Sequence, residues 1–213
     1  MARNSPIEAV ILGSVSGLAA GAVMNQFFKR SGRIRPPQPE GAFTPREPEQ
    51  AGEMATATVA RRVVEGLMLR GPLTEEQKLK GGSVVHYAFS AFWGALFGVI
   101  HGSLPEAAGR VRSAAIAAPL FSLAVWEAGD NVILPAFGLG GPPGRYPLRN
   151  HAYAVLAHLV YGASTVASYE ILDRLVLRRG LISKSGAQGG PQEILIEEGF
   201  RGTSLGTEDT EAA

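Results

Sequence analysis

The sequence contains no cysteine, so it can form no disulfide, no cysteine-ligated zinc or iron–sulfur site and no thiol nucleophile. Charge is also scarce, because Asp, Glu, Lys and Arg make up 18% of the residues, below the quarter that is typical of soluble domains. The net charge of +1 gives no electrostatic basis for a nucleic-acid partner.

Recognisable catalytic motifs are missing as well. The chain has no GxSxG, no P-loop and no GxGxxG, and none of its 4 histidines pairs with another ligand at the HxxxH or HxxE spacing of a helical metal site. The sequence therefore predicts no catalytic residue, no cofactor and no metal ligand set, and it is not typical of an enzyme.

Apolar residues, by contrast, gather into four long runs. Each is about 20 residues or longer, the length that crosses a hydrocarbon core of roughly 30 Å as a helix. Soluble helices of this length carry a charged face, which the first two runs lack. A cleaved signal peptide is the alternative for the first run, since Arg3 precedes it and Ala20-Gly21-Ala22 resembles a cleavage site. The predicted spans are residues 7–28, 84–102, 113–138 and 151–174.

These spans predict an all-α, polytopic integral membrane protein folded as a four-helix transmembrane bundle. The predicted divisions are the N-terminus with the first helix (1–28), a long Pro/Gly-rich polar loop (29–82), three further helices (83–179) and a disordered acidic tail (180–213). Within the loop, residues 50–70 have the pattern of an amphipathic helix, which either docks on the bundle or lies on the membrane surface.

The third run differs from the other spans in its prolines, because Pro119 and Pro135 each predict a kink or a break. A full crossing places the basic segments KRSGRIR and RLVLRRG on opposite sides of the membrane. A re-entrant third run would place both on one side, and the positive-inside rule does not separate the two arrangements.

Glycine is abundant, with 27 residues, and in the first span it recurs every fourth residue at Gly13, Gly17 and Gly21. Small residues at this spacing clear one face of a helix for close approach of another helix. We therefore predict a helix-packing face here, available to another span, to a second copy of the chain or to a membrane partner.

The order of these features resembles a known family. A first helix with repeated small residues is followed by RPPQP (Arg35 to Pro39), by a second helix opening with His86 in HYAFSAFWGALFG, and by a last helix with AHLVYG. Together they are similar to the DUF1440, or YagU-like, family of small bacterial inner-membrane proteins, over roughly Ile7 to Asp173. The resemblance implies a multi-pass protein of the bacterial inner (plasma) membrane, and it carries over no catalytic residue.

Polar residues inside the spans are predicted to meet in one half of the bilayer. At 1.5 Å per residue, Glu127 and His158 come out at similar depth on the side of the long loop. Ionisable groups in a membrane are costly and should face a partner in the bundle interior. The residues predicted to gather at this end are Asn25, His86, Glu127, Asp130, Asn131, His151 and His158.

Several interpretations of this cluster stay open. Glu127 and His158 could form a structural hydrogen bond between helices, a proton or ion pathway, or part of a metal site, while His86 and His151 could simply be wetted at the interface. Two functions follow. One is proton- or ion-linked transport through the cluster, and the other is a structural or assembly protein that packs through its small-residue faces. The expected partners are the lipid bilayer and either a second copy or another membrane protein.

Overall fold

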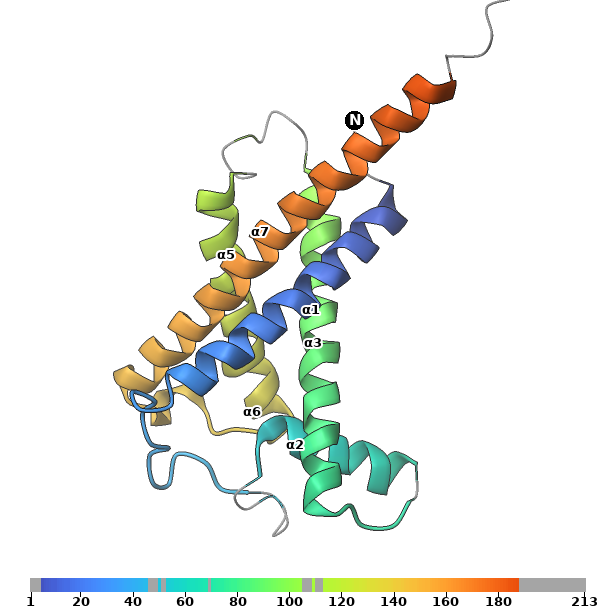
Figure 1. Ribbon diagram of the computed structural model, residues 1–213. Coiled ribbons are helices and arrows are strands. Elements are labelled where there is room, and N and C mark those ends of the chain that lie inside the picture. Colours follow the sequence, from blue (N-terminus) through green and yellow to red (C-terminus); the bar gives the residue numbers. More distant parts are fainter. Residues whose placement is uncertain are drawn as a thin grey trace, which may run out of the picture. The chain divides into compact units, whose positions relative to one another are not determined.

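The structure is a computed structural model that describes residues 5–45, 50, 53–68, 70–104, 109 and 113–187. The described part is helical and contains no strand, which confirms the predicted all-α class. The chain divides into two compact units, Met1–Val176 and Leu177–Ala213. The helices that build the core lie in the first unit (Figure 1). From the second, only residues 177–187 are described, as the continuation of the last helix.

Two long helices begin with the same local device. Helix α1 (Pro6–Arg30) starts at Ser5, whose hydroxyl accepts from the amide of Glu8 while the Glu8 carboxylate accepts from the Ser5 amide. Helix α3 (Glu75–Ser103) starts in the same way at Thr74 and Gln77. Such reciprocal capping satisfies amide donors that the first helical turn leaves unpaired.

Three helices of the described part are long and apolar enough to cross a membrane, which supports a membrane protein. The run at residues 113–138 is also helical, as α5 (Ala114–Trp126), the π-helical segment η4 (Glu127–Ile133) and α6 (Leu134–Ala136). Of the kink or break predicted at each proline, a break does not occur at Pro119, because α5 continues through that residue, and Pro135 lies in α6, which ends at Ala136. The three candidate spans are Pro6–Arg30, Glu75–Ser103 and Leu148–Leu175, the last being part of α7 (Leu148–Ala187).

Helices α1 and α3 make an extensive contact, and glycine makes their close approach possible. A Cβ added to Gly13 would overlap the carbonyl oxygen of Gly94, and one added to Gly17 would overlap that of Ser90. Gly21 lies over the Ser90 side chain. The predicted packing face is therefore occupied within the chain, by α3, and its close backbone approach is the geometry that small residues allow.

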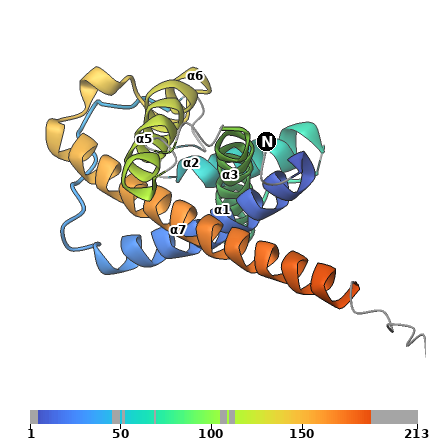
Figure 2. The same ribbon diagram turned by 90° about the horizontal axis from the view of Figure 1, so that it is seen from above.

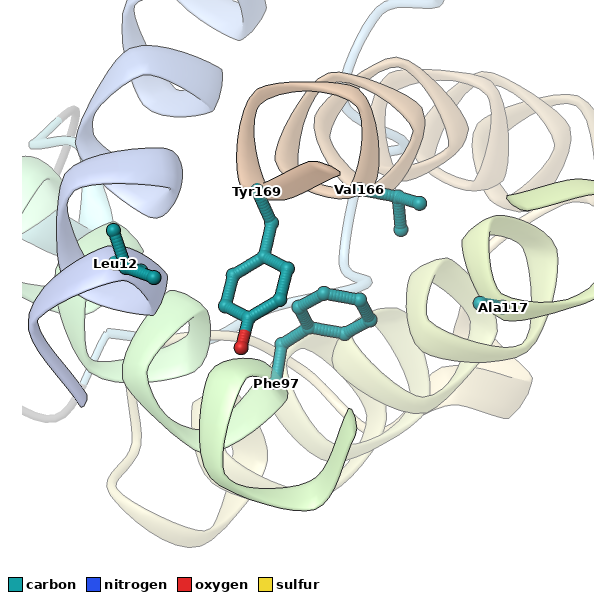
Figure 3. Packing of buried hydrophobic residues seen from close by; sticks show 5 residues of the cluster. All are labelled: Leu12, Phe97, Ala117, Val166 and Tyr169. Atoms are coloured by element: carbon teal, nitrogen blue, oxygen red, sulfur yellow. The ribbon is translucent and has the colours of Figure 1, made fainter. Parts of the chain in front are cut away.

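The core is formed by four helical segments rather than three. Figure 3 shows Tyr169 and Val166 of α7 facing Phe97 of α3, with Leu12 of α1 and Ala117 of α5 on either side. The rings of Phe97 and Tyr169 pack edge to face, with centroids 5.5 Å apart and an interplanar angle of 88°. A second cluster lies nearer the loop side, again with residues from α1, α5 and α7: Ala20, Met24, Val125, Ala157 and Tyr161. Figure 2 shows α5, α1 and α7 arranged around α3.

Outward faces of the long helices are strongly apolar. In α1 the exposed side chains include Ile7, at 72% exposure, and Ile11, at 56%. The same holds for Phe92 and Ile100 of α3. Apolar side chains that face outward over whole helices need an apolar surrounding, which a lipid bilayer supplies.

The polar loop forms a short helix that docks on the start of α3. It consists of α2 (Ala55–Arg61) followed by the π-helical segment η2 (Arg62–Leu67), shorter than the predicted 50–70. Its contact is again close, because a Cβ on Gly81 would lie 2.7 Å from the Ala60 methyl and one on Gly82 would lie 3.1 Å from the Ala57 amide nitrogen. A 3₁₀ turn, η5 (Pro143–Arg145), precedes α7.

At the other end of the chain, α7 extends to Ala187 and so enters the segment predicted to be disordered, 180–213. Residues 188–213 of that prediction lie outside the described residues.

Candidate functional site: a carboxylate–imidazole pair at a π-helical segment

The local backbone of the third run brings its polar residues to the site. Between Glu127 and Ile133 the helix changes from α to π geometry. Single turns of π-helix are rare and are frequently found at functional sites, because they alter the facing of the residues that they contain. Gly129 lies in this turn and is buried. A Cβ added to it would lie 3.8 Å from the ring of Phe89, so α3 covers one side of the segment.

Asp130 of η4 faces His158 of α7. Oδ2 of Asp130 lies 4.0 Å from Nδ1 of His158, and their side chains are 33% and 12% exposed. The two groups come from different helices that are both packed into the core. Carboxylate and imidazole side chains are the groups that most often accept and release protons in proteins, and the charge on one stabilises the opposite charge on the other.

The His158 ring has a defined tautomer. Its Nδ1 lies 2.8 Å from the carbonyl oxygen of Ala154, and a carbonyl only accepts, so Nδ1 carries a proton and donates it. Nε2 has no hydrogen-bond partner among the described residues. The neutral ring therefore keeps Nε2 open as an acceptor, and Nε2 is the atom that can take up a second proton.

The sequence paired His158 with Glu127, and the structure gives a different partner. Glu127 is exposed and accepts a 2.8 Å hydrogen bond from the side-chain amide of Asn131, one turn along the same segment. Helical depth placed Glu127 and His158 at one level but did not fix the direction in which each side chain leaves its helix. The imidazole meets Asp130 instead.

A second imidazole lies at the same end. Nε2 of His151 donates to the carbonyl of Pro143 at 3.0 Å, and its ring packs edge-on against Trp126 and Tyr146. The indole Nε1 of Trp126 is buried without a hydrogen-bond partner in the described part of the chain. His151 and His158 lie two turns apart on α7, and only His158 is placed beside Asp130 by an ion-pair distance.

Asn25 and His86 belong to another place, the contact between α1 and α3. The Asn25 amide donates to the hydroxyl of Tyr87 at 3.2 Å, and Nε2 of His86 donates to the carbonyl of Gly21 at 3.3 Å. No hydrogen bond or ion pair joins either residue to Asp130 within the described ranges. The predicted cluster thus divides into two sets.

Sequence reasoning missed a polar network in the loop. Glu53, with a side chain 8% exposed, pairs with Arg61 Nε at 3.2 Å and with Lys78 Nζ at 2.9 Å, and it also accepts from Thr58. Burial alone would raise the pKa of the Glu53 carboxyl, but the hydrogen bonds from Lys78, Arg61 and Thr58 outweigh it and hold that pKa below its ordinary value. The network ties α2 to the first turn of α3.

Two further loop side chains hold the end of the third run. The guanidinium of Arg62 donates to the carbonyl oxygen of Phe137 at 2.9 Å. The side-chain amide of Gln50 donates to the carbonyl oxygen of Gly138 at 2.6 Å. Carbonyls at a helix end lack partners in their own helix, and a cation there also suits the helix dipole. The polar loop is thereby fastened beside the Asp130 site.

No group of three or more His, Asp or Glu residues suited to a metal ion occurs in the described part. Comparison with protein-family models, with curated proteins and with solved structures found no match for this chain.

Proposed function

We propose that this chain is a four-span protein of the bacterial inner membrane that takes up and releases a proton at the Asp130–His158 pair in the course of transport. The observation that carries the proposal is the 4.0 Å approach of the Asp130 carboxylate to the His158 imidazole across two helices. An ionisable pair in such a position is costly to insert into a membrane, and such pairs mark proton relays and ion pathways.

Four spans follow if the third run crosses the bilayer. Residues 114–136 are continuously helical, which at 1.5 Å per residue is about 34 Å and matches a hydrocarbon core of roughly 30 Å. Ala117 and Val125 of this run take part in the two core clusters. The bacterial inner membrane is supported by the resemblance to the DUF1440, or YagU-like, family, which rests on sequence motifs alone.

Proton access is expected from the side of the polar loop. Asp130 is one-third exposed there, whereas the opposite half is filled by the cluster around Phe97 and Tyr169. This corresponds to a transporter closed on one side, with the protonation site reached from the other. Transport then requires a second conformation in which that cluster opens.

The test is a protonation measurement on the full chain in lipid. We expect a pH-induced infrared difference band of a carboxylate that disappears in Asp130→Asn and persists in Glu127→Gln, a matched control three residues away with an exposed carboxylate. The Nε2 nitrogen of His158 should titrate in the same range by nitrogen NMR. A band that survives Asp130→Asn, or a His158 ring that never changes protonation between pH 5 and 8, overturns the proposal.

A structural or assembly role is the second candidate, and the geometry limits the surfaces through which a partner could bind. The Gly13–Gly17–Gly21 face is occupied by α3, so assembly through that face would require α1 and α3 to separate. A partner would have to bind the exposed apolar faces instead. Normal proton uptake in liposomes containing Asp130→Asn, together with a stable complex in mild detergent, would favour this role.

A further inference from the structure

We propose that a groove between the end of α1 and the side of α7 binds an anionic phospholipid, with the phosphate on Arg30 and one acyl chain along the apolar wall. The groove has a volume of about 440 Å³ and is open along one side. Its wall consists of Val23, Phe27 and Val160, and its polar end of Gln26, Arg30 and Ser31, with the apolar side chain of Ile34 beside them. Nothing in the assignment depends on proton uptake at Asp130, since it needs only the membrane location.

The groove is polar near the membrane surface and apolar deeper in the membrane, as a phospholipid is from its headgroup to its acyl chains. Arg30 is the last residue of α1, at the end of a candidate span, where the headgroups of a bilayer lie. Val23 lies two turns deeper in α1, and Val160 lies three turns inside α7. The polar end is therefore at headgroup depth and the apolar wall is at acyl-chain depth. A volume of this size falls within the roughly 300–1,000 Å³ of ligand sites.

Basic residues are concentrated at this end of α1. Lys29, Arg30, Arg33 and Arg35 lie within one short segment, and no Asp or Glu occurs between Glu8 and Glu40. In the residues that the structure describes, none of these four cations forms an ion pair.

Elsewhere in the described chain, Arg61, Lys78, Lys80 and Arg174 are paired with carboxylates, whereas Arg70, Arg145 and Arg149 stand singly or two together without an ion pair. A basic cluster directly beside a span is a recurrent feature of sites for anionic lipid headgroups.

The same features disfavour other occupants. A second copy of the chain that docked through the same face, as in a twofold-symmetric dimer, would bring an identical basic segment to the groove, and like charges would repel. A free phosphate or a nucleotide would leave the wall of Val23, Phe27 and Val160 without an apolar partner. A zwitterionic lipid fills the wall but carries no net charge for Arg30 and its neighbours. An anionic diacyl lipid satisfies both requirements.

The experiment measures lipid retained by the full chain. Protein in nanodiscs of phosphatidylcholine with a minor share of phosphatidylglycerol is released into mild detergent, and the bound lipid is read by native mass spectrometry. We expect Arg30→Gln to lower phosphatidylglycerol retention about fivefold, the factor given by ~1 kcal/mol per basic residue near an anionic surface. Arg70→Gln, which removes one exposed cation of the loop far from the groove in sequence, should leave retention unchanged.

A second variant tests the apolar wall. Val23→Phe fills the groove from a residue that is 45% exposed, so the fold should tolerate it, and circular dichroism checks that it does. We expect it to reduce retention of phosphatidylglycerol and to leave retention of soluble glycerol phosphate unchanged. Equal retention in Arg30→Gln and Arg70→Gln overturns the proposal, and so does full competition by glycerol phosphate, which would show an anion site without a lipid chain. Loss of a dimer in place of lipid would assign the groove to a second copy and overturn it as well.

Discussion

Nζ of Lys78 lies 2.9 Å from Oε1 of Glu53, and the pair joins the polar loop to the first turn of α3. Glu53 binds Arg61 with its other oxygen, so one carboxylate holds two cations from two helices. The same loop binds the end of the third run through Arg62 and Gln50. Order in the loop and order beside Asp130 are therefore linked through these contacts.

Replacing Glu53 with Gln should loosen this attachment. The amide has no charge for Arg61 and Lys78, and hydrogen bonds to charged groups are the stronger ones. We expect backbone amides of residues 55–67 to exchange with solvent at least about tenfold faster, as measured by hydrogen exchange and mass spectrometry. Glu76→Gln is the matched control, because the Lys80–Glu76 pair is 2.7 Å long but about three-quarters exposed on both sides. Such surface pairs contribute little, and equal exchange in the two variants would contradict the buried network.

The same carboxylate predicts a pH dependence with a definite sign. The pKa of Glu53 lies below its ordinary value in the folded chain, so folding favours the ionised form. Its contribution to stability is then complete above the unfolded value of about 4.3 and is lost as pH falls through the lower folded value. The protection of residues 55–67 against exchange, corrected for the intrinsic pH dependence of amide exchange, should decrease on acidification below about pH 4 in the natural chain. Glu53→Gln should lack this step, and a step of the same size in the variant would assign it to another group.

Hydropathy was sufficient to find the helices. The runs predicted at 7–28 and 84–102 lie within α1 and α3, because lipid-length apolar segments have few other folds. Hydropathy did not predict the residue at which α3 begins. That helix starts at Glu75, well before the apolar run, since the Thr74–Gln77 capping box and the ion pair of the half-buried Lys78 with Glu53 stabilise a polar first turn. Boundaries set by capping and tertiary contacts carry little hydropathy pattern.

The candidate site was predicted only in part, for a geometric reason. Depth along a helix follows from counting residues, and it placed Asp130 and His158 in the same half of the bundle. The partner of each group depends on rotation about the helix axis. In the π-helical segment η4 that rotation differs from the α-helical value, which the sequence analysis assumed for the whole run. Because no apolar pattern encodes a π turn, the sequence could not predict that Asp130, and not Glu127, lies beside His158.

Removing the guanidinium of Arg62 should free the end of the third run. Arg62→Gln loses the 2.9 Å hydrogen bond to the Phe137 carbonyl and the cation at a helix C-terminus, which together contribute about 1 kcal/mol. We expect hydrogen exchange to increase over residues 134–141 and to stay unchanged in the α1–α3 contact. Arg70→Gln should have neither effect. An increase spread evenly over all helices would show global destabilisation and would contradict a local role for Arg62.

The α1–α3 contact predicts an order among three glycine substitutions. Gly17→Ala places a methyl group on the Ser90 carbonyl oxygen, and since backbone cannot rotate away, the helices must separate, at about 1–3 kcal/mol or more. Gly21→Ala meets the Ser90 hydroxyl at 2.7 Å, a side chain that can turn, so its cost should be smaller. Gly66→Ala enters open space in a helical segment and should gain up to about 1 kcal/mol from helix propensity.

Thermal unfolding of the full chain in lipid, followed by circular dichroism, should rank these variants with Gly66→Ala highest, Gly21→Ala lower and Gly17→Ala lowest. The clash in Gly17→Ala is with α3 of the same chain, so its effect should not change on dilution of the protein in detergent. An effect of Gly17→Ala that depends on protein concentration would mean that this face packs between copies. Equal melting temperatures of Gly17→Ala and Gly66→Ala would contradict the close approach of the α1 and α3 backbones at Gly17.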